Sequence, residues 1–112
     1  MPLLQINTNK AIKDIDQLAS EASRLTAEML GKPESYVMVE ISADSVLTFA
    51  GTNEPCAHLK LKSLGLDEDQ TTAYSETLCQ FITQHLEIPG SRIYIEFSSP
   101  ARHMWGWDDG TF

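Results

Sequence analysis

The chain has 112 residues, enough for one domain that buries a core without metals or disulfides. Its 8 Lys and Arg residues face 16 Asp and Glu residues, which gives a net charge of −8. Such a chain repels nucleic-acid phosphates and anionic membranes, so we expect no nucleic-acid or membrane partner. The N-terminal residues lack the basic and apolar segments of a signal peptide. The two cysteines, Cys56 and Cys79, are typical of reduced thiols in a cytoplasmic protein.

The first half of the chain is predicted to form strand, helix and strand. Residues 3–8 open it, and a helix follows from about residue 14 to residue 30. Gly31 suits the position after the last helical turn, and Pro33 prevents the helix from continuing. Alternating residues predict a strand over 36–41, and residues 44–53 are predicted to be a turn or a short edge strand.

The second half repeats this order. A strand is predicted over 57–63, and a helix is predicted to begin near Asp67, with Gln70 as the third residue after it in an approximate capping box. The helix carries an apolar stripe that ends at His85. The closing strand is predicted over 92–97, and residues 98–112 form a tail that contains glycines and aromatic residues.

An internal repeat relates the two halves. When the sequence is shifted by half its length, residues 30–42 fall over residues 86–98 with matching Leu, Pro, Ser and Glu positions. We therefore predict one α/β domain with an internal duplication, about 1–56 and 57–112. Strand–helix–strand units have parallel strands and right-handed crossovers, so two units predict a four-stranded sheet with two helices on one face.

Two helices on one side leave the other sheet face uncovered. Tyr36 and Met38 alternate with Val37 and Val39, so the pattern predicts apolar residues on both faces of this strand. Other copies of the same chain are the simplest cover for such a face, and this predicts an oligomer.

Several motifs along the chain resemble one known family. They are residues 1–9, Gly31-Lys32-Pro33, residues 49–57, residues 61–65, residues 92–95 and the ending Gly106-Trp107-Asp108-Asp109-Gly110-Thr111-Phe112. Together they are similar to the macrophage migration inhibitory factor family of the tautomerase superfamily, over nearly the whole chain. The resemblance implies a trimeric barrel of β-α-β-β-α-β subunits with active sites between them. It also implies an isomerase, a keto–enol tautomerase that acts on phenylpyruvate-like α-keto acids and dopachrome analogues.

The resemblance implies a role for Pro2 in particular. An initiator Met before a small residue is usually removed, so the mature chain would begin with the secondary amine of Pro2. An α-amino group titrates at about 7.7–8.0, and burial or a nearby cation lowers its pKa toward that of a usable base. Pro2 matches the catalytic proline that moves a proton between carbon and oxygen of the substrate. A Met-Pro start alone is ordinary and indicates no catalysis.

The other implied site residues bind substrate. Lys32 matches a lysine that contacts the substrate carboxylate, although by itself it would be a solvated charge at a helix end. Leu64 matches a position whose backbone N–H binds substrate. Tyr94 matches a tyrosine supplied by the neighbouring subunit; by itself it would be an aromatic residue in a strand. Aromatic residues expected around the pocket mouth are Tyr36, Trp107 and Phe112.

Three positions depart from the family pattern. Glu96 replaces an asparagine and is expected to share a strand face with Tyr94 and to approach the pocket. It is expected to raise the pKa of the Pro2 amine unless it is paired with a lysine or protonated. Trp105 replaces a small aliphatic residue. Lys62 replaces a histidine and adds a cation near the site. No phosphate-binding glycine loop is present, and we expect no cofactor and no metal.

Two other functions stay open at this stage. Animal members act as cytokines that are secreted without a signal peptide and bind cell-surface receptors, so the chain could be a signalling ligand with little catalysis. The intact set of Pro2, Lys32 and Tyr94 favours the enzyme. Superfamily dehalogenases and decarboxylases use additional arginines near the site, and this chain has only Arg24, Arg92 and Arg102.

Overall fold

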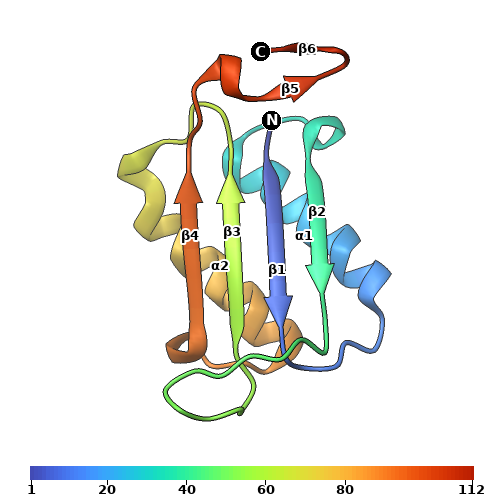
Figure 1. The fold of residues 1–112 in the computed structure, drawn as a ribbon, viewed down its shortest axis with the longest axis vertical. Helices are drawn as coiled ribbons and strands as arrows, with labels where there is room; N and C mark the ends of the chain where they lie inside the picture. The colour runs from blue at the N-terminus through green and yellow to red at the C-terminus, as the bar shows by residue number, and fades with distance from the viewer.

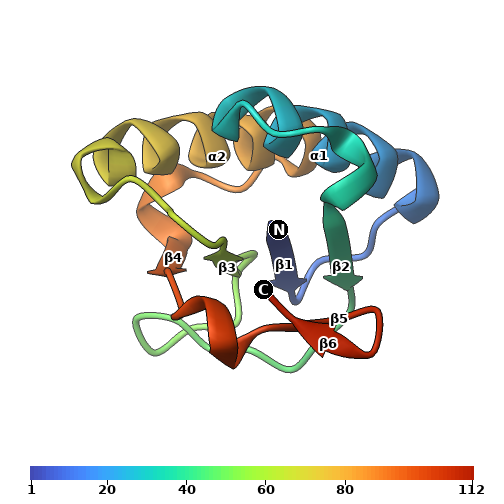
Figure 2. The ribbon, with the colours of Figure 1, turned by 90° about the horizontal axis from the view of Figure 1, so that it is seen from above.

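The computed structural model describes residues 1–112 and has two layers, a mixed sheet and a pair of helices (Figure 1). Both helices pack against the same face of the sheet (Figure 2). The elements in chain order are β1 (Leu3–Thr8), α1 (Ile15–Leu30), β2 (Met38–Ser42), β3 (Ala57–Lys62), α2 (Thr71–Leu86), β4 (Ile93–Ser98), β5 (Gly106–Trp107) and β6 (Gly110–Thr111). Neither helix has the length and apolar character needed to cross a membrane.

The strand order is β2-β1-β3-β4. β1 and β2 are parallel, as are β3 and β4, whereas the two central strands β1 and β3 are antiparallel. This confirms the predicted sheet of two strand–helix–strand units. The two helices begin 56 residues apart, at Ile15 and Thr71, and also end 56 residues apart. The correspondence supports an internal duplication, which stays a prediction.

Local capping sets the helix bounds. The Asp14 side chain accepts a hydrogen bond from the Gln17 N–H at the start of α1, and Gly31 ends it with φ of 64°. The prediction for α2 was too early by four residues. Asp67 caps a 3-10 turn, where its side chain accepts from the Asp69 N–H, and the α-helix begins only at Thr71.

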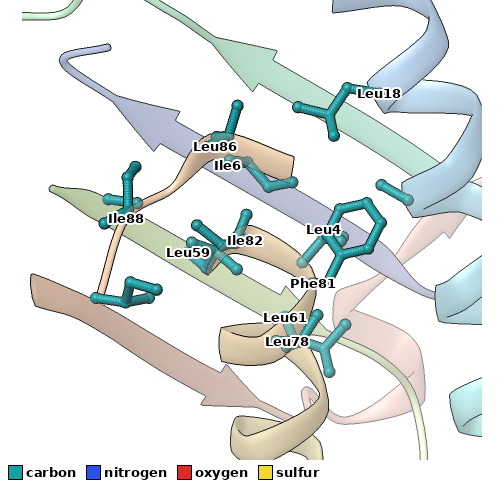
Figure 3. Packing of buried hydrophobic residues seen from close by; sticks show 13 residues of the cluster. Leu4, Ile6, Leu18, Leu59, Leu61, Leu78, Phe81, Ile82, Leu86 and Ile88 are labelled. Atoms are coloured by element: carbon teal, nitrogen blue, oxygen red, sulfur yellow. The ribbon is translucent and has the colours of Figure 1, made fainter. Parts of the chain in front are cut away.

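The core lies between the helices and the sheet (Figure 3). Alternate residues of a strand point to the same face, so every second residue of β1 and β3 enters this layer. Leu4 and Ile6 of β1 and Leu59 and Leu61 of β3 are almost completely buried. They meet side chains of α2 that include Leu78, Phe81 and Ile82.

The uncovered face of the sheet is mostly polar, which corrects the prediction of two apolar faces. Beside Leu3, Met38 and Tyr94 it carries polar or charged residues: Gln5, Asn7, Glu40, Ser42, His58, Lys60, Lys62, Glu96 and Ser98. The prediction failed because it was based on the start of the strand predicted over 36–41. Tyr36 belongs to a 3-10 turn, and β2 begins only at Met38.

The loop between β2 and β3 forms a turn closed by Phe49 and Thr52 and contains no edge strand. The Arg92 guanidinium holds this loop by donating hydrogen bonds to the carbonyl oxygens of Phe49, Glu54 and Pro55 at 3.0–3.1 Å. At the opposite end of the sheet, the β5–β6 hairpin lies beside the N-terminus on the side away from the helices (Figures 1 and 2).

Candidate active site

Two adjoining pockets surround the start of β1. The first, of about 510 Å³, has fourteen lining residues that include Pro2, Tyr36, Lys62, Trp105 and Trp107. The second, of about 690 Å³, is lined by Met1, Lys32, Pro33, Tyr36, Leu64, Gly65, Arg102 and Phe112. Met1, Tyr36 and Phe112 line both pockets. The pockets are therefore neighbouring parts of one hollow around the N-terminus.

Pro2 lies at the floor of the first pocket. It is fully buried, and its carbonyl oxygen accepts a hydrogen bond of 3.0 Å from the Met38 N–H. A proline at the edge of a strand leaves no donor unpaired, because its nitrogen carries no hydrogen within the chain. This hydrogen bond to β2 therefore holds Pro2 in a fixed position in the lining of the first pocket.

The turn after α1 positions Lys32. Its backbone N–H donates to the Ala27 carbonyl oxygen at 3.0 Å, so the residue follows directly from the Gly31 helix end. The Lys32 Nζ donates to the Leu64 carbonyl oxygen at 2.7 Å and has no carboxylate partner. The Leu64 N–H donates no hydrogen bond within the chain. Lys32 and the Leu64 backbone thus lie together in the second pocket; their roles in substrate binding stay predictions.

The N-terminal amine lies in surroundings that favour its neutral form. Burial lowers the pKa of the Met1 α-amino group below its ordinary value of 8.0, and the neighbouring Lys32 ammonium lowers it further. Arg102 adds a smaller effect of the same sign. Pro2 follows Met1 directly and lines the first pocket. We expect burial and the two cations to lower the pKa of the Pro2 amine in the same direction once Met1 is removed.

The C-terminal tail supplies aromatic walls. Trp107 and Phe112 stack with ring centroids 5.7 Å apart, and the Phe112 N–H donates to the Trp105 carbonyl oxygen. The Lys62 Nζ lies 5.8 Å from the centroid of the Trp105 ring. Two of the three departures from the family pattern, Lys62 and Trp105, therefore line the first pocket together.

Tyr94 and Glu96 line neither pocket of their own chain. Tyr94 pairs with His58 near the far end of the sheet, whereas Leu3 beside Pro2 pairs with Lys62. Tyr94 is 66% exposed and packs edge-on against Phe49.

The Glu96 carboxylate contacts the ring of His58 and has no lysine partner. It shares the uncovered face with Tyr94, as predicted. Their assignment to the site therefore depends on a neighbouring subunit.

Three further residues belong to the hollow that no sequence motif indicated: Arg102, Met38 and Met104. Arg102 lines the second pocket, and Met38 and Met104 line the first. Met38 follows from its pairing with Leu3. No local pattern marks Arg102 and Met104, because they lie on a single 3-10 turn, Arg102–Met104, between β4 and the hairpin.

Comparison with known proteins defines the class. The family described as macrophage migration inhibitory factor matches residues 1–112. The macrophage migration inhibitory factor of Mus musculus is 34% identical over 114 residues, 100% of this chain and 99% of the relative. The homologue from Trichuris trichiura is 37% identical over the full length of both chains.

A crystal structure of the homologue from Prochlorococcus marinus superimposes with a TM-score of 0.93 at 41% identity, over 98% of each chain. The chain belongs to the macrophage migration inhibitory factor family, within the tautomerase superfamily.

Proposed function

We propose that this protein is a keto–enol tautomerase that acts on phenylpyruvate-like α-keto acids and dopachrome analogues. The Pro2 amine, exposed when Met1 is removed, is its general acid–base. The observation that carries the proposal is the N-terminal amine with a lowered pKa beside Lys32, in a hollow with aromatic walls. A neutral amine at physiological pH is a competent base, and its conjugate acid can return the proton.

The proposed reaction needs one proton transfer in each direction. The neutral Pro2 amine removes a proton from C3 of the keto acid, and the electron pair moves into a carbon–carbon double bond with C2. The carbonyl oxygen then carries negative charge and takes the proton back from the Pro2 ammonium, which gives the enol and restores the neutral amine. Lys32 stabilises the substrate carboxylate and the charge that develops beside it.

We propose that the working form is a homotrimer in which Tyr94 reaches the pocket of a neighbouring subunit. Support comes from the fold, since the edge strands β2 and β4 each have one free edge, and each carries a large side chain that is 66% exposed, Met38 and Tyr94. Strand edges with exposed apolar side chains are surfaces that other chains cover.

The test is a steady-state assay of phenylpyruvate tautomerisation after mass spectrometry has shown that Met1 is absent. We expect turnover, and we expect Pro2→Gly to lower kcat/KM by about 10²–10⁴-fold. A matched preparation that retains Met1 ahead of Pro2 should lose activity to a similar degree. Full activity with Met1 retained would refute Pro2 as the base. No turnover by the processed protein would contradict the enzyme and favour the signalling ligand.

A further inference from the structure

Within one chain, three cations surround the hollow without any acidic partner; in the trimer proposed above, Glu96 of a neighbouring subunit is the acid that could be added. Lys32, Lys62 and Arg102 line it, and neither pocket has an Asp or Glu among its lining residues. The ion pairs of the structure involve only Lys10, His58 and His85 as cations. The chain has 16 acidic residues and only 8 Lys and Arg. Three of these cations gather at this hollow with no acidic lining residue, although acidic residues outnumber basic ones in the chain. The charge of the hollow is suited to an anionic ligand with more than one negative group.

The cations lie at two places in the hollow. Lys32 and Arg102 line the second pocket, whereas Lys62 lines the first. Met1 lines both, so its removal takes away a side chain between them. The amine of Pro2 would then lie between a pair of cations on one side and a single cation on the other.

The position of the Lys62 side chain is set by the strand alternation and by the Trp105 ring. Leu61 enters the core, so the strand alternation directs Lys62 to the open face. There its ammonium lies over the half-buried Trp105 ring, 5.8 Å from the centroid. An aromatic face attracts a cation but takes none of its hydrogen bonds, which leaves the three N–H donors of Lys62 for a ligand.

We propose that the cavity accepts 2-oxo acids with a second acidic group at the far end of the molecule. The 2-oxo carboxylate would bind at Lys32 and Arg102, and the distal acid at Lys62, with an aromatic or unsaturated spacer along Tyr36 and the Trp107 ring. This inference rests on the proposed tautomerase function and names its substrate class. It places the carbon that exchanges a proton next to Pro2, between the two anchored ends.

The experiment compares phenylpyruvate with 4-carboxyphenylpyruvate, which adds one carboxylate at the far end of the ring. We expect a higher kcat/KM for the diacid, and we expect Lys62→Met to lower the diacid-to-monoacid ratio of kcat/KM about tenfold, the effect of one charge-assisted hydrogen bond. Lys62→Arg keeps the charge and should keep most of the ratio. Lys60→Met is the matched control, because Lys60 lies two residues away on the same face and lines neither pocket; the ratio should not change.

A binding measurement separates this inference from the catalytic proposal. Benzene-1,4-diacetate has two carboxylates and cannot undergo this tautomerisation. Calorimetry should show that it binds more tightly than phenylacetate, and this difference in affinity should be lost in Lys62→Met. If neither keto acid is turned over but this binding pattern is found, the tautomerase is wrong and the two-anion cavity stands. If phenylpyruvate is turned over while the substrate ratio and the diacid binding are both insensitive to Lys62→Met, the second anion site is overturned.

Discussion

Lys32 shows how one side chain can affect both binding and proton transfer. Its Nζ is held by the Leu64 carbonyl oxygen, which fixes the charge without neutralising it. The same charge acts on the N-terminal amine, where it favours the unprotonated form. In the proposed mechanism, Lys32 would therefore support catalysis in two ways, by binding the substrate carboxylate and by lowering the pKa of the base.

We expect Lys32→Met to change the pH profile of kcat/KM as well as its height. A neighbouring cation lowers the pKa of the amine, so its removal raises that pKa, and the acid limb should move to higher pH. Rates measured from pH 5 to pH 9 on the processed protein test this. Lys13→Met, at an exposed lysine outside both pockets, should leave the limb in place. An acid limb that stays unchanged or moves to lower pH in Lys32→Met would show that Lys32 does not tune the base.

The two helices end at equivalent positions with different residues. Gly31 follows α1 with φ of 64°, and Glu87 follows α2 with φ of 58°. Glycine adopts this left-handed conformation without cost, whereas a residue with a Cβ is strained there. The second half of the chain therefore keeps the geometry of the helix end without the residue that favours it.

Glu87→Gly should raise the free energy of unfolding by about 0.5–1 kcal/mol. This is the backbone strain that the substitution relieves, minus the cost of the greater conformational entropy of glycine in the unfolded chain. The contact that would be lost is weak, because Lys10 Nζ lies 4.0 Å from an exposed Glu87 carboxylate. Urea unfolding at one fixed protein concentration measures the change. The reverse substitution in the first half, Gly31→Glu, should lower stability; a stabilising Gly31→Glu or a destabilising Glu87→Gly contradicts this account of the helix ends.

At the scale of the whole molecule, one chain leaves an incomplete set of expected site residues. The start of β1 brings together Pro2, Lys32 and Tyr36, but Tyr94 lies toward the other end of the sheet. The two outer strands have free edges. An assembly that joins these edges is the direct way to bring Tyr94 of one chain to Pro2 of another.

Light scattering of the processed protein in dilute buffer should give three times the 12.5 kDa mass of the chain. Because the pocket proposed above is completed by a second chain, activity per chain should fall on dilution only where light scattering shows that the trimer dissociates. A stable monomer with full tautomerase activity would contradict the shared site.

Glu96→Asn tests the same assembly through electrostatics. In the strand register Glu96 lies opposite Lys60 of β3, and Lys60 lies opposite Gln5 of β1. Within one chain Glu96 is therefore about 10 Å along and about 10 Å across the sheet from Pro2. Salt screens charges over about this distance, so Glu96 of the same chain should not affect the amine. Glu96 of a neighbouring subunit would raise the pKa of the amine, and its removal should move the acid limb of kcat/KM to lower pH. An unchanged profile would show that His58 neutralises Glu96 or that the carboxylate stays remote from the site.

Much of the fold follows from short-range patterns. The bounds of β1 and α1 were predictable because strand alternation, the Asp14 cap and the Gly31 helix end act within a few residues. The start of α2 was less predictable, since a 3-10 turn and an α-helix have similar sequence preferences over a single turn.

The sequence by itself indicated the two helices, the four strands of the main sheet and, through the resemblance, the residues expected at the site; it did not indicate the β5–β6 hairpin. Only the tertiary structure decided which of these site residues line the same hollow. The antiparallel pairing of β1 and β3 places Lys62 opposite Leu3, and the turn after β4 returns Arg102 to the N-terminus. Strand pairing and chain reversal join residues far apart in sequence, and no local periodicity encodes them. For the same reason the polar character of the open face and the contact between Glu96 and His58 appear only when all four strands are in place.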